Sequence, residues 1–340
     1  MKNKKWISLA AAVVLAVTAL PAGVFAAKRD GTEEKLTKVT LNEVAHSIFY
    51  APQYVAIEEG YFEEEGLDLT LVTGFGADKV LTALISGEAD IGFMGAEASI
   101  YACQEGATDP AVNFAQLTQR AGNFLVAREE MPDFKWEDLK GKKVLGGRKG
   151  GMPEMVFEYI LKKNGIDPQK DLTIDQSIDF GSTAAAFTGD DSAAYTVEFE
   201  PSATILEKEG AGYVVASLGE ASGYVPYTSY SAKESYMKEN PEIIQKFTNA
   251  LQKGMDYVQS HTPEEIAEVI APQFKETDLD TITTIVKRYY DQDTWKENLI
   301  FEKDSFELLQ DILEDAGELN TRAEYEKLVE TEYAQKACES

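Results

Sequence analysis

Two glutamates carry the clearest chemistry in this sequence. Glu97 and Glu198 each follow the third predicted strand of one of two similar segments. A carboxylate that faces a water-poor cleft attracts N–H donors or a cation and opposes an oxyanion. The pair therefore favours a ligand with an amine or another N–H group. Alternatively, each Glu caps the next helix, where a negative charge is favoured in any case, and Glu200, just before Pro201, suits that role better.

A basic, glycine-rich turn offers the opposite chemistry. Arg148, Lys149, Gly150 and Gly151 come directly before a predicted helix start. Backbone N–H groups and positive charge at such a point could hold an anion. The same residues equally suit a tight strand-to-helix turn with solvated cations. The GxxxxGK[ST] spacing of a nucleotide-binding loop is absent.

Aromatic rings and one histidine could complete a binding site. A stacked aromatic face contributes about 0.5 to 1.5 kcal/mol beyond its buried area, and we expect two or three of the candidate rings to stack on a planar ligand. The candidates are Tyr50, Phe75, Phe180, Phe199, Tyr224 and Tyr227. His46 lies at a predicted strand end, where a neutral imidazole can both donate and accept a hydrogen bond. A structural role for His46 is the alternative.

Two similar runs of strand and helix must position these residues. Residues 84–106, LISGEADIGFMGAEASIYACQEG, and residues 187–210, FTGDDSAAYTVEFEPSATILEKEG, share a helix end, a Gly with acidic residues, a strand, a Glu and a new helix. A repeat of roughly 100 residues is a domain-scale duplication rather than a solenoid. The sequence thus predicts two similar α/β lobes, and small ligands prefer the cleft between such lobes.

Strands and helices alternate in both halves, which predicts sheets of parallel strands with helices on both faces. Ligands of open α/β sheets bind beyond the carboxyl ends of the strands. Strands are expected at 39–45, 67–72 and 89–94, then at 143–146, 172–178 and 193–197. The predicted ligand-binding residues are His46, Ser47, Tyr50, Phe75, Gly95, Ala96, Glu97, Arg148, Gly150, Gly151, Met152, Phe180, Ser182, Glu198, Glu200 and Tyr227.

The predicted fold class is α/β, with two similar lobes built on doubly wound sheets around a ligand cleft, plus C-terminal helices. Lobe one is expected to be discontinuous, with residues 37–124 and 226–340, and lobe two to span 125–225. Helix starts are expected at Asn240, Thr262, Asp278 and Asp304. These helices should pack on lobe one.

The first 26 residues read as a secretory signal. Three lysines, an apolar stretch from Trp6 to Leu20 and a small-residue pattern ending at Ala26 predict cleavage after Ala26. Lipid anchoring would need a Cys directly after the leader, and the two cysteines are Cys103 and Cys338. We therefore expect an unlipidated protein outside the cytoplasm, with free thiols rather than a disulfide framework.

Charge and missing motifs restrict the function further. A net charge of -27 repels nucleic-acid phosphates and anionic membranes. His46 and His261 are far apart in the chain, and the acidic runs lack calcium-loop spacing, so no metal site is predicted. The GxSxG elbow of many hydrolases is absent. We expect no catalytic residue, no metal and no cofactor.

Several blocks of the chain resemble a known family. HSIFYAPQYVAIEEGYFEEEGLDLTLV at 46–72, ALISGEADIGF, DLKGKKVLGGRKGGMPE, EFEPSATILEKEG and GYVPYT follow one another in that family's order, within about residues 38 to 260. The family is that of bacterial substrate-binding proteins for nitrate, sulfonates, taurine and thiamine-precursor pyrimidines. The resemblance implies a type II periplasmic-binding-protein fold that closes on a small molecule and delivers it to an ABC permease, without catalysis.

The expected function is capture of a small planar nitrogen-containing nutrient by an extracytoplasmic monomer, with a thiamine-precursor pyrimidine as first candidate. A sulfonate, taurine or nitrate ligand held by the Arg148 turn is the alternative within the family. An alternative of another class is a secreted enzyme of the pyrimidine-synthase superfamily. The eukaryotic synthases resemble this family but use a Cys-rich and His-bearing site, whereas this chain has two His and two scattered Cys.

Overall fold

The computed structural model describes residues 35–178 and 180–339, and for Phe180 it describes the backbone only. The predicted signal segment 1–26 lies outside the described residues. Lys35–Ser340 form one unit of the fold. Within the described part of the chain, no helix combines the length and the apolar character needed to cross a membrane.

The first sheet has five strands in the order β2-β1-β3-β10-β4. β1 runs parallel to β2 and β3, whereas β10 runs antiparallel to β3 and β4. The bounds are β1 Thr37–Glu43, β2 Leu67–Thr73, β3 Ile91–Gly95, β4 Ala111–Thr118 and β10 Thr228–Lys233.

The second sheet repeats this pattern, in the order β7-β6-β8-β5-β9. β6 is parallel to β7 and β8, and β5 is antiparallel to β8 and β9. The bounds are β5 Asn123–Ala127, β6 Lys143–Leu145, β7 Thr173–Asp175, β8 Tyr195–Phe199 and β9 Tyr213–Ser217. The predicted α/β class with two similar sheets is confirmed.

The prediction of parallel sheets was incomplete, because each sheet contains one antiparallel strand beside its third strand. That strand is supplied by a chain crossing: β5 arrives directly after β4 of the first sheet, and β10 returns after β9 of the second. Each of these strands enters from the opposite sheet and therefore runs antiparallel to its new neighbours. Local alternation of strand and helix carries no information about such a crossing.

Helices flank both sheets. Those of the first half are η1 Ile48–Tyr50, α1 Ala51–Glu58, α2 Tyr61–Glu64, α3 Ala77–Ser86 and α4 Glu97–Gln104. Those of the second half are η2 Trp136–Leu139, α5 Met152–Lys163, α6 Phe180–Gly189, α7 Ser202–Lys208 and α8 Leu218–Ser222. The C-terminal part has α9 Glu234–Glu239, α10 Pro241–Ser260, α11 Pro263–Ile270, η3 Ala271–Gln273, α12 Leu279–Asp291, α13 Lys303–Asp315, α14 Tyr325–Leu328 and α15 Glu332–Cys338.

Three of the four predicted C-terminal helix starts are confirmed. α10, α11 and α12 have the N-caps Asn240, Thr262 and Asp278. Thr262 forms a capping box with Glu265, in which each side chain accepts a hydrogen bond from the other's backbone. The fourth start is displaced: Asp304 was expected to precede the helix, but α13 begins at Lys303 and its N-cap is Glu302, two residues before Asp304.

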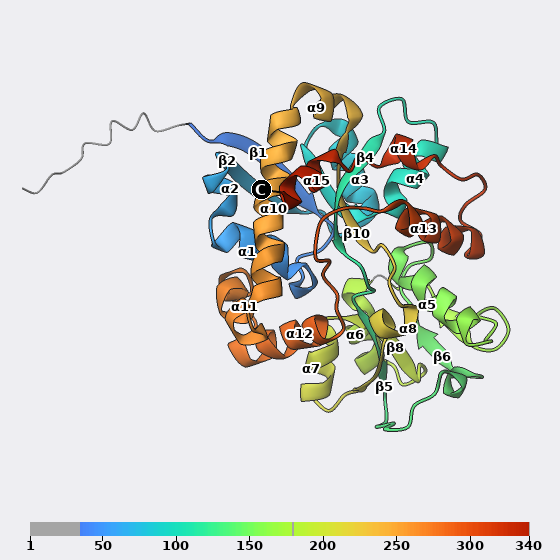
Figure 1. The fold of residues 1–340 in the computed structure, drawn as a ribbon. Helices are drawn as coiled ribbons and strands as arrows, with labels where there is room; N and C mark the ends of the chain where they lie inside the picture. The colour runs from blue at the N-terminus through green and yellow to red at the C-terminus, as the bar shows by residue number, and fades with distance from the viewer. Residues whose placement is uncertain (1–34, 179, 340) are drawn as a thin grey trace, which may run out of the picture. The chain divides into compact units, whose positions relative to one another are not determined.

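The C-terminal helices contact both halves of the fold, which goes beyond the predicted packing on lobe one. α10 packs along α1 and α2 of the first half. Arg288 of α12 forms an ion pair of 2.7 Å with Glu200, just before α7. Lys162 of α5 forms one of 2.9 Å with Asp315 of α13, and these two helices lie side by side (Figure 1).

Candidate functional site

The carboxyl ends of the central strands of the two sheets meet where the halves touch. Ser47, in the segment after β1, donates from Oγ to the Glu200 carbonyl at 3.4 Å. Tyr101 of α4 donates from its hydroxyl to the Gly150 carbonyl at 3.2 Å. The segments that follow β1, β3, β6 and β8 therefore face one another, as the strand-end rule for ligand sites requires.

Glu97 is buried at this junction, with 4% of the residue exposed. It is the first residue of α4, and its carboxylate lies so close to Gly95 that a Cβ there would approach Oε2 to 2.1 Å. Burial raises the pKa of Glu97 to about 7, although its own backbone N–H, the charge of Arg148 and the Met152 N–H act to lower that pKa. Oε2 has no hydrogen-bond partner among the described residues.

The glycine-rich turn lies opposite Glu97. Arg148 is exposed and forms no ion pair with a described residue, while its charge acts on the Glu97 carboxyl. Gly151 is the N-cap of α5 and has no side chain to satisfy the first N–H groups. The predicted contact residues Gly150 and Met152 thus come together with Glu97, although Gly150 donates its own N–H to Glu154 at 3.1 Å.

Two tyrosines and an asparagine line the same junction. The charge of Glu97 raises the pKa of both the Tyr50 and the Tyr227 hydroxyls, after a larger effect of burial, so both lie within its electrostatic range. Tyr227 donates to Asn123 Oδ1 at 2.6 Å. The Nδ2 of Asn123 is buried and has no partner among the described residues. Tyr50 makes no hydroxyl hydrogen bond to a described residue, and its ring packs on Phe93 at 4.5 Å between centroids.

Glu198 and Glu200 differ from Glu97 because their carboxylates are satisfied within the fold. Glu198 lies inside β8, not past its end as predicted, since the strand starts and ends two residues later than expected. Thr196 and Thr183 donate to it at 2.6 and 3.0 Å, which lowers its pKa, but burial dominates and raises the pKa to about 7. Glu200 accepts from the Thr204 N–H at 2.9 Å and pairs with Arg288, although Pro201, not Glu200, is the N-cap of α7.

His46 is engaged in structural contacts. Its Nδ1 lies 2.8 Å from Oε1 of Glu43, and its Nε2 lies 3.0 Å from the Gln273 carbonyl. Glu43 is fully buried and also accepts from Tyr54 at 2.8 Å, so its carboxylate anchors a network. The hydrogen bond to Glu43 raises the pKa of His46. Ser47 caps η1 by accepting the Phe49 N–H.

The remaining predicted residues fall into three groups. Gly95 and Ala96 are buried beside Glu97. Phe75 is 75% exposed at a positive φ of 57°, and Ser182 is exposed on α6, so neither takes part in the buried junction. The side chain of Phe180 lies outside the described residues. The other aromatic candidates divide similarly: Phe199 is half-buried near Tyr227, whereas Tyr224 is exposed and lies under Arg120.

Sequence analysis missed Asn123, Tyr101 and Glu43. The strand-end rule points to residues that follow the carboxyl end of a strand. Asn123 is the first residue of β5 and Glu43 is the last residue within β1, so the rule selects neither. The available signal for Glu43 was an acidic residue inside the predicted strand 39–45. Such a residue needs buried partners, and here it has them.

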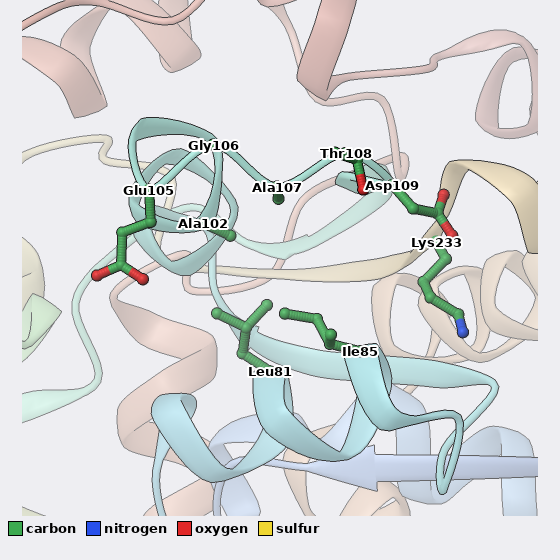
Figure 2. A pocket seen from close by; sticks show the side chains of 9 residues that line it. All are labelled: Leu81, Ile85, Ala102, Glu105, Gly106, Ala107, Thr108, Asp109 and Lys233. Atoms are coloured by element: carbon green, nitrogen blue, oxygen red, sulfur yellow. The ribbon is translucent and has the colours of Figure 1, made fainter.

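Two surface hollows lie elsewhere. One of about 430 Å³ is bordered by α3, the end of α4 and the end of β10, and Figure 2 shows Leu81 and Ile85 of α3 pointing toward the segment after α4. A second, of about 220 Å³, lies by β6 and β7. Neither includes a residue of the junction, whose polar groups are covered by the contact between the halves. Among the described residues no cluster of His, Cys, Asp or Glu could hold a metal ion, and both cysteines are free thiols.

Two crossed-over sheets of this order, joined at the strand ends, define the type II periplasmic-binding-protein fold. The SsuA alkanesulfonate-binding protein of Xanthomonas axonopodis pv. citri superposes with a TM-score of 0.69 at 16% identity, over 87% of this chain and 99% of that one. At that identity the likeness concerns the fold.

The chain belongs to the NMT1/THI5 like family, whose profile matches residues 48–266. It is 46% identical to YtlA of Bacillus subtilis, named as a binding protein, over 98% of each chain. It is 26% identical to the 4-amino-5-hydroxymethyl-2-methylpyrimidine phosphate synthase of Aspergillus parasiticus, over 62% of this chain and 63% of that one. The chain is thus similar to a binding protein over nearly its whole length and, at lower identity, to synthases.

Proposed function

We propose that the protein captures a small planar nitrogen-containing molecule, with a thiamine-precursor pyrimidine as first candidate, between its two lobes and delivers it to an ABC permease. One observation carries the proposal: Glu97 Oε2 is buried at the junction, and no described residue forms a hydrogen bond with it. A buried acceptor left unpaired costs about 1 to 3 kcal/mol, so a ligand N–H placed there would gain strongly. The same carboxylate opposes an oxyanion.

Neighbouring groups favour a ring with alternating donor and acceptor atoms. Asn123 Nδ2 is a donor that no described residue satisfies, and the Tyr50 hydroxyl can donate or accept. An aminopyrimidine edge offers an amino N–H beside a ring nitrogen acceptor, which matches Glu97 and Asn123. Tyr50 and Tyr227 supply aromatic faces for the ring. In this proposal Glu97 is the primary contact and Glu198 a supporting group, since threonines already satisfy Glu198.

A sulfonate, taurine or nitrate ligand is the second candidate. The observation in its favour is Arg148, exposed and without an ion pair to a described residue, beside the uncapped start of α5. A positive charge at a helix N-terminus suits an anion. The secreted-enzyme alternative is tested by mass spectrometry of candidate ligands after incubation, because a binding protein returns them unchanged.

We further propose that the leader is removed after Ala26, that the mature protein acts outside the cytoplasm without a lipid anchor, and that it is a monomer. The two sheets would be the cores of the lobes, with residues 125–225 as lobe two. Mass spectrometry of the secreted protein would give the mature N-terminus directly, and light scattering would give the oligomeric state.

The central test is ligand binding to the mature protein and two variants. Because a ligand binds the folded state, a hundredfold excess over Kd should stabilise it by about 2.7 kcal/mol, seen as a higher melting temperature. The panel is 4-amino-5-hydroxymethyl-2-methylpyrimidine, riboflavin, taurine, methanesulfonate and nitrate. Calorimetry with the best ligand should show a loss of about 1.5 to 3 kcal/mol for Glu97→Gln and a smaller loss for Glu198→Gln.

Glu105→Gln is the matched control, because it removes the same formal charge from the exposed end of α4. It should bind like the wild type. No melting shift with any ring compound would refute the proposed ligand class. A preference for the sulfonates, with binding unchanged in Glu97→Gln, would favour the second candidate.

A further inference from the structure

The start of α5 leaves one backbone N–H outside the hydrogen bonds of the helix. α5 is 12 residues long and its N-cap is a glycine, so no side chain of the helix caps the first N–H groups. Pro153 has no N–H, and the N–H groups of Glu154 and Met155 bond to the Gly151 carbonyl at 3.1 Å. The Met152 N–H has no intrahelical acceptor. With the exposed Arg148 beside it, this end combines a donor outside the hydrogen bonds of the helix with positive charge.

A carboxylate from the other half of the fold is directed into this position. The charge of Arg148 and the N–H of Met152 both act on the Glu97 carboxyl. This carboxyl is buried, and one of its oxygens has no hydrogen-bond partner in the part of the chain that the structure describes. Glu97 comes from α4, which follows β3 of the first sheet. Arg148 lies in the loop between β6 and α5, and Met152 is the first residue of α5. The contact therefore forms across the junction.

We propose that Arg148 and the N-terminus of α5 form an anion-binding subsite, and that Glu97 occupies it as an internal ligand, so that this glutamate excludes oxyanions from the site. The inference rests on the proposed function, because it concerns which ligands the same site rejects. An incoming sulfate or sulfonate must displace the Glu97 carboxylate and remain beside its negative charge. A ring with an N–H donor instead finds an acceptor in place.

Proton uptake should relieve the exclusion. Burial raises the pKa of Glu97 to about 7, so this carboxyl gains a proton as the pH falls from 8 to 6. Four groups face this carboxyl: Arg148 across the junction, Tyr50 of η1, Tyr227 in the segment before β10, and Tyr101, which lies on α4 with Glu97. The arginine stays charged and the tyrosines stay neutral over this range.

One other carboxyl near the turn also titrates there. Glu154 accepts the Gly150 N–H, and burial raises the pKa of Glu154 to about 7. A pH effect in the wild type alone could therefore come from either glutamate. A variant at position 97 separates the two contributions, because Glu154 is unchanged in it.

Calorimetric titration of the full mature chain with sulfate tests the proposal. At pH 8, Glu97→Gln should bind sulfate at least about tenfold more tightly than the wild type, since an opposing charge is gone and the donors remain. Adding Arg148→Ala to that variant should remove most of the gain. Glu105→Gln, with the same change in net charge, should match the wild type. No gain in Glu97→Gln, or an equal gain in Glu105→Gln, would overturn the proposal.

Two further measurements keep the test decisive. If Glu97→Gln does not fold, Glu154→Gln, in which only Glu97 of the two can titrate, should bind sulfate several-fold more tightly at pH 6 than at pH 8, and equal affinities would refute the exclusion. If Glu97→Gln folds, its sulfate affinity should vary less with pH than that of the wild type. The sulfate comparison needs no ring ligand, so a failed pyrimidine screen and a failed exclusion are distinct results.

Discussion

Three glutamates that share a raised pKa have different partners, and this difference decides their roles. Burial is the largest cause for Glu97, Glu154 and Glu198 and brings each pKa to about 7. Glu198 accepts from two threonines, and Glu154 accepts from a backbone N–H and from Gln176 at 2.5 Å. Glu97 alone of the three keeps an oxygen without a partner among the described residues. A buried carboxylate with spare acceptor capacity is suited to a ligand, and a satisfied one to the fold.

These shifts predict that the free protein loses stability as the pH rises from about 4.5 to about 7. In that range the unfolded chain has already released the proton of each glutamate, whose ordinary pKa is near 4.3, while the folded chain still holds it. The folded state therefore binds more protons, and the free energy of unfolding falls with increasing pH. Above about pH 7 both states are ionised and this contribution is constant.

Glu198→Gln should make the pH dependence shallower, because an amide does not titrate. Urea unfolding at pH 5 and at pH 7.5, in wild type and variant, measures the difference. Glu105→Gln is the control for the general repulsion of a chain with net charge -27. Equal slopes in all three proteins would show that Glu198 is not protonated in the fold at pH 5.

At the scale of elements, one close approach fixes the packing of the longest helix. A Cβ on Gly254 of α10 would lie 2.3 Å from the Pro52 carbonyl of α1. The obstacle is backbone, which cannot rotate away, so the two helices would have to separate. This contact holds the C-terminal helices against the helix that follows Ser47 and Tyr50, and so supports one side of the junction.

Gly254→Ala is therefore expected to destabilise the protein by about 1 to 3 kcal/mol, the usual cost of overpacking, despite the better helix propensity of alanine. Gly189→Ala is the matched control, since no atom lies within 4 Å of the Cβ it would add to the end of α6. Urea unfolding measures both. A neutral or stabilising Gly254→Ala would mean that α1 and α10 can part without loss of packing.

Elements with local signals were predictable, and contacts between distant elements were not. Thr262 and Asp278 mark helix starts because a side-chain cap acts within one turn, and Asn240 precedes Pro241, which suits the first helical position. The repeat indicated two similar sheets. The antiparallel strands β5 and β10 depend on which sheet the chain joins after a crossing, which no local pattern records.

The candidate site shows the same division. Strand-end position led to Glu97, Arg148 and Met152, which the structure brings together. The bond between Tyr227 and Asn123 joins residues 104 positions apart, so no window of sequence contains it. Glu198 appeared equivalent to Glu97 only while β8 was expected to end two residues earlier. An error of two residues in a strand is enough to exchange a binding role for a structural one.

At the scale of the whole molecule, side-chain contacts tie the second half to the C-terminal part, which also packs on the first half. These contacts act in addition to the chain crossings. Arg288 of α12 pairs with Glu200 and with Glu207 of α7, and its guanidinium is largely buried between them. On another side, Lys149 pairs with Glu318 at 3.4 Å and Lys162 with Asp315 at 2.9 Å. A protein that binds by lobe closure must break or re-form such ties when it opens.

The Arg288 tie should set how far the free protein opens. Removing the guanidinium leaves the buried Glu200 without its ion partner, and an opened arrangement lets water reach that carboxylate, so Arg288→Met should favour opening. Small-angle scattering should then give a larger radius of gyration for the free variant than for the free wild type. A saturating ligand should bring both to the same smaller value, because it binds the closed state more tightly.

Arg322→Met is the control: it removes ion pairs with Glu307, Asp311 and Glu314, all on α13, and leaves the contacts between the halves intact. An equal change in both variants, or none in Arg288→Met, would mean that the chain crossings alone govern the opening.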